Sequence, residues 1–151
     1  MSVSSVYIVG IHSTPVGKFP DRTLKQLTAE AVAGAIEDAG LENGRALETA
    51  TFANCGMWVE GQGSIRGQVM LTPLISQGQL SERMPIVNVE GGCASASIAM
   101  QSARKDILAG EADLALAVAA ERTFYPGRPD LGQALFNGGI DQYDPQQWLD
   151  Y

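Results

Sequence analysis

The 151-residue sequence has little charge and no concentration of positive charge. Charged residues make up 18% of it, and the formal net charge is −7. A protein that binds a nucleic-acid backbone needs a basic surface, so nucleic acid is not expected as a partner. The acidic total leaves a nucleotide-containing ligand open, because a local patch can bind what the average charge repels.

Cysteine and long apolar runs are also scarce. The two cysteines, Cys55 and Cys93, are too few for a disulfide framework, and the first residues lack the basic and apolar regions of a secretion signal. No apolar run approaches the roughly 20 residues that a bilayer span requires. We therefore expect two free thiols, no membrane span and a cytoplasmic location.

The residues that are present favour a compact α/β domain, because 45% are hydrophobic and 17 are glycine. Thr23 and Gln26 have the spacing of a capping box, and Gly40 and Gly110 stand where helices stop. Pro73 must kink or end a helix that begins near residue 64. The predicted elements are strands over residues 6–11, 49–55, 85–89 and 114–120, with helices over 24–39, from 64 onward, and over 94–109. This alternation predicts a largely parallel sheet that helices cover on both faces.

The sequence changes character after Glu121, where prolines and glycines predict a loop-rich tail. The tail is nevertheless apolar, with Phe124, Leu131, Leu135, Phe136, Ile140, Trp148 and Tyr151. Either these residues fold back on the domain, or the chain ends in the middle of a larger structure, and we favour the second. We therefore assign residues 1–122 to an α/β domain. Residues 123–151 begin a loop-rich region that is truncated or completed by another chain.

The segment with the strongest chemical content is residues 90–97, Glu-Gly-Gly-Cys-Ala-Ser-Ala-Ser. It lies between a predicted buried strand and a predicted helix, where ligands and nucleophiles gather in parallel α/β sheets. The paired glycines permit a sharp turn and close approach of a ligand. A thiol on the first helical turn, Cys93, lies at the positive end of the helix dipole, which stabilises a thiolate. The alternative is a free cysteine buried in a close-packed turn.

Five other residues have both a structural and a chemical interpretation. His12, the only histidine, is expected on the surface rather than in catalysis. Cys55 is expected to pack structurally, although it could lie near the site. Arg66 is expected at an interface or beside acidic side chains, more than on a ligand phosphate. Glu90 could accept backbone N–H bonds, lie across a dimer interface or act as a general base. Glu121 is expected to order the loop that follows it.

Several spaced motifs resemble the thiolase family. Residues 89–95, Val-Glu-Gly-Gly-Cys-Ala-Ser, together with residues 107–113 and the run 114–121, look like the active-cysteine region of thiolases. The opening residues 6–11 and 14–19 are similar to the first strand and loop of the sterol-carrier type, a group close to the acetyl-CoA acetyltransferases. Residues 61–66 resemble the glycine-rich segment at the thiolase dimer interface. The resemblance covers residues 6 to 122 in order.

The resemblance implies the N-terminal part of a layered α/β/α thiolase fold, incomplete without a C-terminal half. It implies an acyl-CoA C-acyltransferase of lipid metabolism, which performs Claisen condensation or thiolytic cleavage through an S-acyl intermediate on Cys93. A CoA thioester would be the substrate, with no cofactor and no metal. A histidine and usually a second cysteine from the C-terminal half would supply acid–base catalysis. A homodimer or tetramer, pairing at the edge over residues 86–89 and possibly including a second subunit, is also implied.

Two departures from the family pattern concern the acyl pocket rather than the nucleophile. Ala96 stands where thiolases commonly have glycine, and Gly91 and Gly92 stand where many relatives have bulkier or polar residues. Two alternatives to acyl transfer stay open at this point. One is a thiolase-like lyase that performs retro-aldol cleavage of a CoA-linked substrate with a partner subunit. The other is a non-catalytic thiolase-like subunit.

Overall fold

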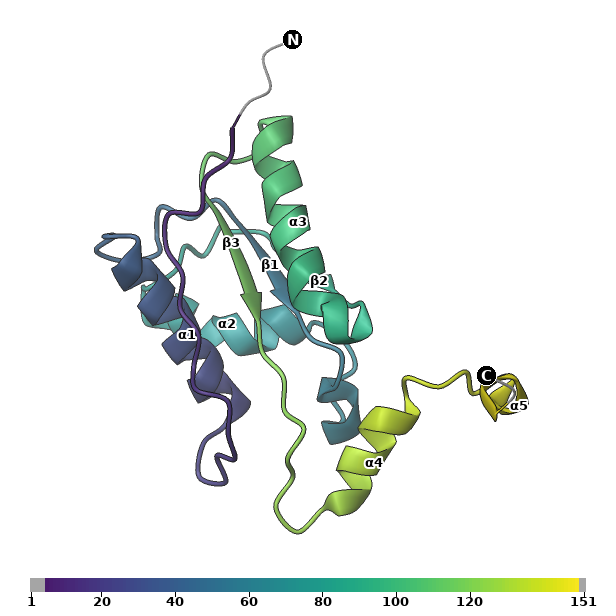
Figure 1. Ribbon diagram of the computed structural model, residues 1–151. Helices are drawn as coiled ribbons and strands as arrows, with labels where there is room; N and C mark the ends of the chain where they lie inside the picture. Colours follow the sequence, from purple (N-terminus) through teal and green to yellow (C-terminus); the bar gives the residue numbers. More distant parts are fainter. Residues whose placement is uncertain (1–4, 150–151) are drawn as a thin grey trace.

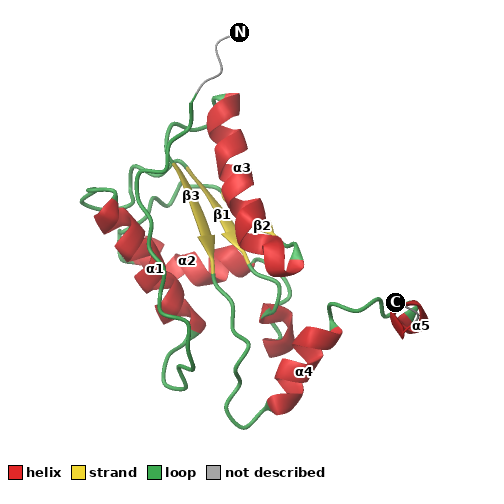
Figure 2. Ribbon diagram, in the orientation of Figure 1, coloured by secondary structure: helices red, strands yellow, loops and turns green. Residues whose placement is uncertain are grey.

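A computed structural model describes residues 5–149 and contains a parallel sheet of three strands (Figures 1 and 2). Its strand order is β2-β1-β3, with β1 at Thr49–Ala53, β2 at Ile86–Val89 and β3 at Ala115–Ala119. In this register Ala53 pairs with Val89 on one side and with Ala119 on the other. Because all three strands are parallel, their carboxyl ends lie at the same edge of the sheet. The expected α/β class and the mostly parallel sheet are confirmed.

The helices alternate with these strands along the chain. They are α1 (Leu24–Asp38), α2 (Arg66–Ser76), α3 (Ser95–Ala109), α4 (Pro129–Asn137) and α5 (Pro145–Leu149), with short 3-10 helices η1 (Met57–Glu60) and η2 (Gly92–Ala94). Pro73 lies inside α2, which continues for three residues beyond it before ending. Within residues 5–149, no helix combines the length and the apolar character needed to cross a membrane.

The sheet lies between two helical layers, as Figure 1 shows. Phe52 of β1 is fully buried on the side of α2, where Gly67 approaches its Cβ atom, and α1 packs beside α2. Helix α3 covers the other face and buries Ala99 and Ala103 against the strands. All five residues of β1 are buried, as a central strand covered on both faces requires.

The helix boundaries follow signals present in the sequence. Thr23 caps α1 by accepting a bond from the Gln26 backbone N–H at 3.2 Å, and the Gln26 side chain accepts one from the Thr23 N–H at 2.8 Å. Gly40 and Gly110 adopt positive φ angles of 68° and 76° just after α1 and α3. These left-handed positions favour glycine and stop the helix. The predicted capping box and both predicted stops are confirmed.

The prediction of a buried strand over residues 6–11 is wrong. The segment is extended but pairs with no strand among residues 5–149, and the exposed fractions of Tyr7, Ile8 and Ile11 are 77%, 72% and 72%. It lies along α1 instead, where the Ile11 N–H donates to Asp38 Oδ2 at 2.8 Å. Gly10 contacts the same helix closely, since a Cβ atom there would lie 2.3 Å from the Ala35 carbonyl oxygen. An apolar β-branched run indicates strand propensity, but a strand also needs a partner.

The tail contains two short helices, α4 and α5, among its loops. Pro129 occupies the first turn of α4, where its missing N–H has no cost. Helix α4 lies against η1, with Leu135 beside Gly56 and Trp58 beside Gly138. Phe136 on the same helix keeps 71% of its surface exposed. Of the apolar tail residues named above, Tyr151 and the side chain of Trp148 lie outside the described part.

We predict that Gly67→Ala destabilises the domain. An added Cβ atom would lie 2.6 Å from Phe52 Cβ, 2.8 Å from Ile86 Cγ2 and 3.1 Å from Asn88 Oδ1. Alanine is favoured over glycine within a helix by about 1 kcal/mol, but overpacking against strands that cannot move costs more, up to about 3 kcal/mol. We expect the free energy of unfolding in urea to fall by about 1–2 kcal/mol. The control is Gly63→Ala, where nothing lies within 4 Å; equal stability of the two variants would contradict this packing.

Candidate active site

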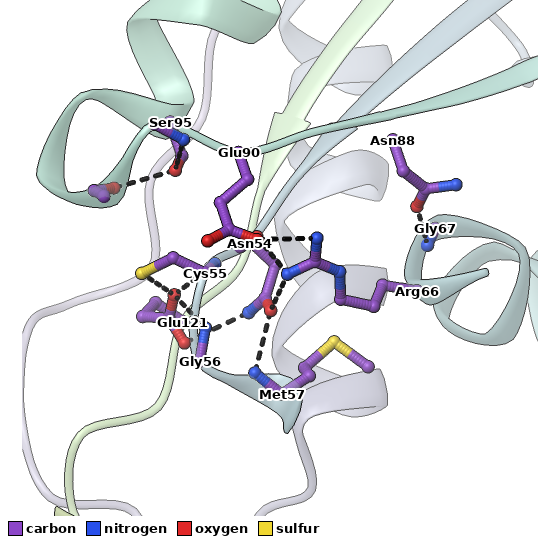
Figure 3. A network of polar contacts seen from close by, with 12 residues as sticks. Asn54, Cys55, Gly56, Met57, Arg66, Gly67, Asn88, Glu90, Ser95 and Glu121 are labelled. Atoms are coloured by element: carbon purple, nitrogen blue, oxygen red, sulfur yellow. Dashed lines mark hydrogen bonds and ion pairs between the residues drawn. The ribbon is translucent and has the colours of Figure 1, made fainter. Parts of the chain in front are cut away.

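The polar residues that follow the three strands meet at the carboxyl edge of the sheet, as Figure 3 shows. Asn54 and Cys55 follow β1, Glu90 follows β2, and Glu121 follows β3 after one residue. Arg66, the first residue of α2, reaches the same edge. Segments far apart in the sequence are thereby brought into one hydrogen-bonded network.

Asn54 is the centre of this network and is 2% exposed. Its Nδ2 donates to the Ala120 carbonyl oxygen at 2.7 Å and to Glu121 Oε1 at 3.0 Å. Its Oδ1 accepts from the Met57 N–H at 2.9 Å, which starts the turn into η1. A buried amide is stable only when its donors and acceptors are paired. Here that pairing connects the ends of β1 and β3.

Arg66 makes the corresponding connection between β1 and β2. Its Nη1 donates to the Asn54 carbonyl oxygen at 2.6 Å, and its Nη2 forms an ion pair with Glu90 Oε2 at 3.0 Å. Only 12% of the Arg66 side chain is exposed, against 53% of Glu90. The expected role beside acidic side chains is therefore confirmed for Arg66. Glu90 accepts from this guanidinium rather than from backbone N–H groups.

Glu121 orders the loop after β1 more than its own loop. Its Oε2 accepts from the backbone N–H groups of Cys55 at 2.9 Å and Gly56 at 3.1 Å. The Cys55 thiol donates to the same oxygen, with Sγ at 3.0 Å. A bond from the Arg122 N–H, at 3.2 Å, is its contribution to the segment that follows it.

The Cys55 thiol is held in its protonated form. Burial, followed by the hydrogen bond to Glu121 and the negative charge of Glu121, raises the pKa of Cys55 to about 12. Smaller contributions in the same direction come from Glu90 and Cys93. Both groups are therefore within electrostatic range of the Cys55 sulfur.

Cys93 is exposed and lies in η2, the 3-10 turn that leads from β2 into α3. The turn depends on Gly92, whose φ of +55° is strained for other residues. Ser95 closes it, because its hydroxyl accepts from the Gly91 N–H at 2.9 Å and donates to the Gly92 carbonyl oxygen at 2.7 Å. The predicted sharp turn is confirmed, and Cys93 is exposed on it rather than buried within the described residues.

His12 lies on the other side of the sheet from α3. Its ring packs on Gly34 of α1, and its Nε2 atom lies 3.9 Å from Glu30 Oε1. His12 therefore lies against α1. The edge of the sheet that leads to Cys93 instead brings together Cys55, Arg66, Glu90 and Glu121.

The sequence interpretation missed Asn54. The available signal was a polar residue directly after the apolar segment Ala50–Ala53, at the carboxyl end of a predicted strand. Its partners, 66 and 67 positions away, could not be named without the strand order.

Two hollows lie beside Arg122. A hollow of about 300 Å³ is lined by Leu24, Met57 and Arg122 among others, and a second, of about 270 Å³, lies between residues 13–19 and 121–124. Cys93 lines neither of them. Within the part of the chain that the structure describes, no group of three or more His, Cys, Asp or Glu side chains is arranged to hold a metal ion.

Comparison with known proteins connects this geometry to one family. A family model described as "Thiolase, N-terminal domain" matches residues 6–123. The chain is also similar to a solved structure of an acetyl-CoA acetyltransferase from Syntrophomonas wolfei, with a TM-score of 0.61 and 26% identity. That similarity covers 72% of this chain and 26% of the solved chain.

Three similar proteins also have the names of acetyl-CoA acetyltransferases or of a thiolase subunit. An acetyl-CoA acetyltransferase of Methanothermobacter thermautotrophicus is 29% identical over 119 residues, which are 78% of this chain and 29% of the relative. The acetyl-CoA acetyltransferase of Methanocaldococcus jannaschii is 28% identical over 117 residues, 78% of this chain and 28% of its own length. The benzoylsuccinyl-CoA thiolase subunit BbsB of Thauera aromatica is 28% identical over 116 residues, 77% of this chain and 28% of that subunit. The chain thus spans less than a third of these relatives.

We predict that Cys55 titrates far above an ordinary thiol. Because the folded state raises its pKa from 9.0 to about 12, the proton is bound more tightly in the folded than in the unfolded chain. The stability gained is fully present below pH 9.0 and is lost as the pH rises through about 12. Measured by mass spectrometry, the iodoacetamide reaction rate of native Cys55 should rise tenfold per pH unit from about pH 8 to 10. In urea the thiol has the pKa of the unfolded chain, 9.0, so the reaction rate should level off above that pH.

Two variants sharpen this measurement. Glu121→Gln removes the hydrogen-bonded negative charge and should move the native curve to lower pH, while burial keeps it above the curve in urea. Glu82→Gln, at the opposite end of β2, should leave the curve unchanged. A native rate that levels off near pH 9 would show that Cys55 is an ordinary exposed thiol.

Proposed function

Because the chain belongs to the thiolase family through its N-terminal domain, matched over residues 6–123, we propose that it forms part of an acyl-CoA C-acyltransferase in which Cys93 accepts the acyl group. The observation that supports this most directly is the exposed Cys93 thiol on the glycine turn between β2 and α3 of a thiolase N-terminal domain. The names of the relatives, two acetyl-CoA acetyltransferases and a thiolase subunit, support acyl transfer over the lyase alternative.

In the proposed reaction the Cys93 sulfur attacks the carbonyl carbon of a CoA thioester. The carbonyl oxygen becomes an oxyanion, and the tetrahedral adduct collapses when the bond to the CoA sulfur breaks. CoA leaves as the thiol after taking up a proton, and the acyl group stays on Cys93 as a thioester. Attack on this thioester by CoA completes cleavage, and attack by the enolate of a second acyl-CoA completes condensation.

The residues around Cys93 serve to position it. Arg66 holds Glu90 at the start of the turn, and the Ser95 hydroxyl holds the two glycines that precede Cys93. Cys93 lies just before α3, where the positive end of the helix dipole favours negative charge. A nucleophile fixed by its backbone loses little freedom when substrate binds.

The remaining catalytic groups belong, in this proposal, to a C-terminal half in the same polypeptide or in a second subunit. Thioester chemistry needs a base, an oxyanion hole and shielding from water. Cys93 is exposed and lines neither of the two hollows described above, so a further surface has to enclose the acyl group. We assign residues 1–122 to the N-terminal domain and residues 123–151 to the start of the region that joins it to that surface. The expected setting is CoA-linked lipid metabolism in the cytoplasm.

We also propose that two copies pair at the outer edge of β2. Among residues 5–149 this strand pairs with β1 alone, so its second edge is open in the described part of the sheet. Val87 in the strand is 47% exposed, and Ile98 and Met100 of the neighbouring α3 are 37% and 48% exposed. An open edge beside apolar side chains favours pairing with another strand.

We predict that acetyl-CoA acylates Cys93 in the polypeptide or assembly that contains this chain and its C-terminal half. Intact-mass and peptide spectrometry should locate one acetyl group on Cys93. Cys93→Ser should abolish the adduct and lower the rate of thiolysis at least about a thousandfold, because the covalent route is lost.

Cys55→Ser is the matched control, since it removes the other thiol and should keep the acetyl group on Cys93. An adduct on Cys55, or none in an assembly that turns over acetyl-CoA, would sink the assignment of Cys93.

We predict that Val87→Lys weakens the proposed dimer by about tenfold or more, because a charged side chain at a strand edge opposes edge-to-edge pairing. Light scattering across a dilution series would measure the dissociation constant. Val16→Lys, at a fully exposed loop position, is the control. A dimer that withstands Val87→Lys would place the interface elsewhere.

A further inference from the structure

The fold brings the two cysteines of the chain to the same edge of the sheet. Cys55 lies two residues after Ala53, and Cys93 lies four residues after Val89, which pairs with Ala53 in the neighbouring parallel strand. The strands continue to pair one step further, where the Asn54 N–H donates to the Val89 carbonyl oxygen at 3.4 Å. Adjacent strands lie about 4.8 Å apart, so the loops that carry the two cysteines leave the sheet side by side.

One guanidinium fixes the two segments that bear these thiols. Arg66 binds the carbonyl oxygen of Asn54, the residue before Cys55, and the carboxylate of Glu90, three residues before Cys93. The residues nearest the sulfurs have more backbone freedom, because Gly56 follows Cys55 and Gly92 precedes Cys93. The bases of the two loops are therefore held together by Arg66, and their tips are held by Glu121 and by Ser95, so a bond between the sulfurs has to break some of these contacts.

The two thiols differ in accessibility and in hydrogen bonding. Cys93 is exposed, whereas Cys55 is partly buried and donates its proton to Glu121 Oε2. Among the contributions that raise the pKa of Cys55, burial is the largest and Cys93 the smallest. A dissolved oxidant reaches Cys93 first, and Cys55 stands behind it as a protonated thiol with a carboxylate to accept its proton.

We propose that Cys93 and Cys55 form a reversible disulfide when a hydroperoxide oxidises Cys93. The Cys93 thiolate attacks the outer peroxide oxygen, the O–O bond breaks, and water or an alcohol leaves once protonated. Cys93 is now a sulfenic acid, oxidised by two electrons. The Cys55 sulfur then attacks the Cys93 sulfur and the S–O bond breaks. Glu121 transfers the Cys55 proton to the departing hydroxide, which leaves as water.

This disulfide protects the thiol from further oxidation. A sulfenic acid that meets a second peroxide becomes a sulfinic acid, which ordinary thiols do not reduce, whereas a dithiol reductant restores both cysteines from a disulfide. The inference depends on the placement of the two thiols and not on acyl transfer. It therefore stands or falls independently of the function proposed above.

The test is peroxide treatment of the chain, followed by maleimide blocking and peptide mass spectrometry without reduction. We expect a linked peptide containing Cys55 and Cys93, the loss of two hydrogen atoms from the monomer mass, and full reversal by dithiothreitol. The wild-type chain alone gives this result, so a variant that fails to fold cannot obscure it.

Cys55→Ser supplies the second measurement. With the resolving thiol removed, dimedone should trap at least about tenfold more sulfenic acid on Cys93 than in the wild type, and higher peroxide should convert Cys93 to sulfinic acid. Equal trapping in both proteins, a Cys93–Cys93 link between chains, or no oxidation of Cys93 would each overturn the proposal.

Discussion

The arrangement of the carboxyl edge of the sheet depends on the hydrogen bonds of the Asn54 side-chain amide. Buried at the end of the central strand, it binds the backbone that leaves β3 and the turn that leaves β1. Arg66 extends the connection to the end of β2. Parallel strands are joined by long crossovers, so the hydrogen bonds of the sheet fix their spacing but not the paths of the loops beyond them. The polar network fixes those paths, and Cys55 and the turn before Cys93 take their places from it.

Much of the fold follows from local signals in the sequence. The capping box at Thr23 and the glycines after α1 and α3 define helix ends through bonds and backbone angles within a few residues. Residues 6–11 do not form a strand, because a strand needs a hydrogen-bonded partner and an apolar run does not identify that partner. Within the tail, Pro129 begins α4, because a proline that breaks a helix in its interior is favourable in the first turn.

In the candidate site, too, some features follow from adjacent residues and others from contacts between distant ones. The position of Cys93 on a glycine turn between a strand and a helix follows from residues that are adjacent in the sequence. The partners of Cys55 and Asn54 do not, because Glu121 reaches them only when β3 lies next to β1. Neighbouring strands could have been assigned in another order by the same apolar pattern. Hydrogen bonds across 65 to 67 positions are a property of the topology.

The turn before Cys93 also limits how this protein can evolve. At position 92 the positive φ restricts the choice to glycine, and a side chain at position 91 would have to displace Ile98, whose Cδ1 atom lies 2.1 Å from where a Cβ would stand. Position 92 therefore resists a side chain that measures the length or branching of an acyl chain, whereas position 91 can accept one if the flexible end of Ile98 moves aside. At this turn a change of acyl preference is thus open at position 91, while the backbone at position 92 keeps the approach to the sulfur the same.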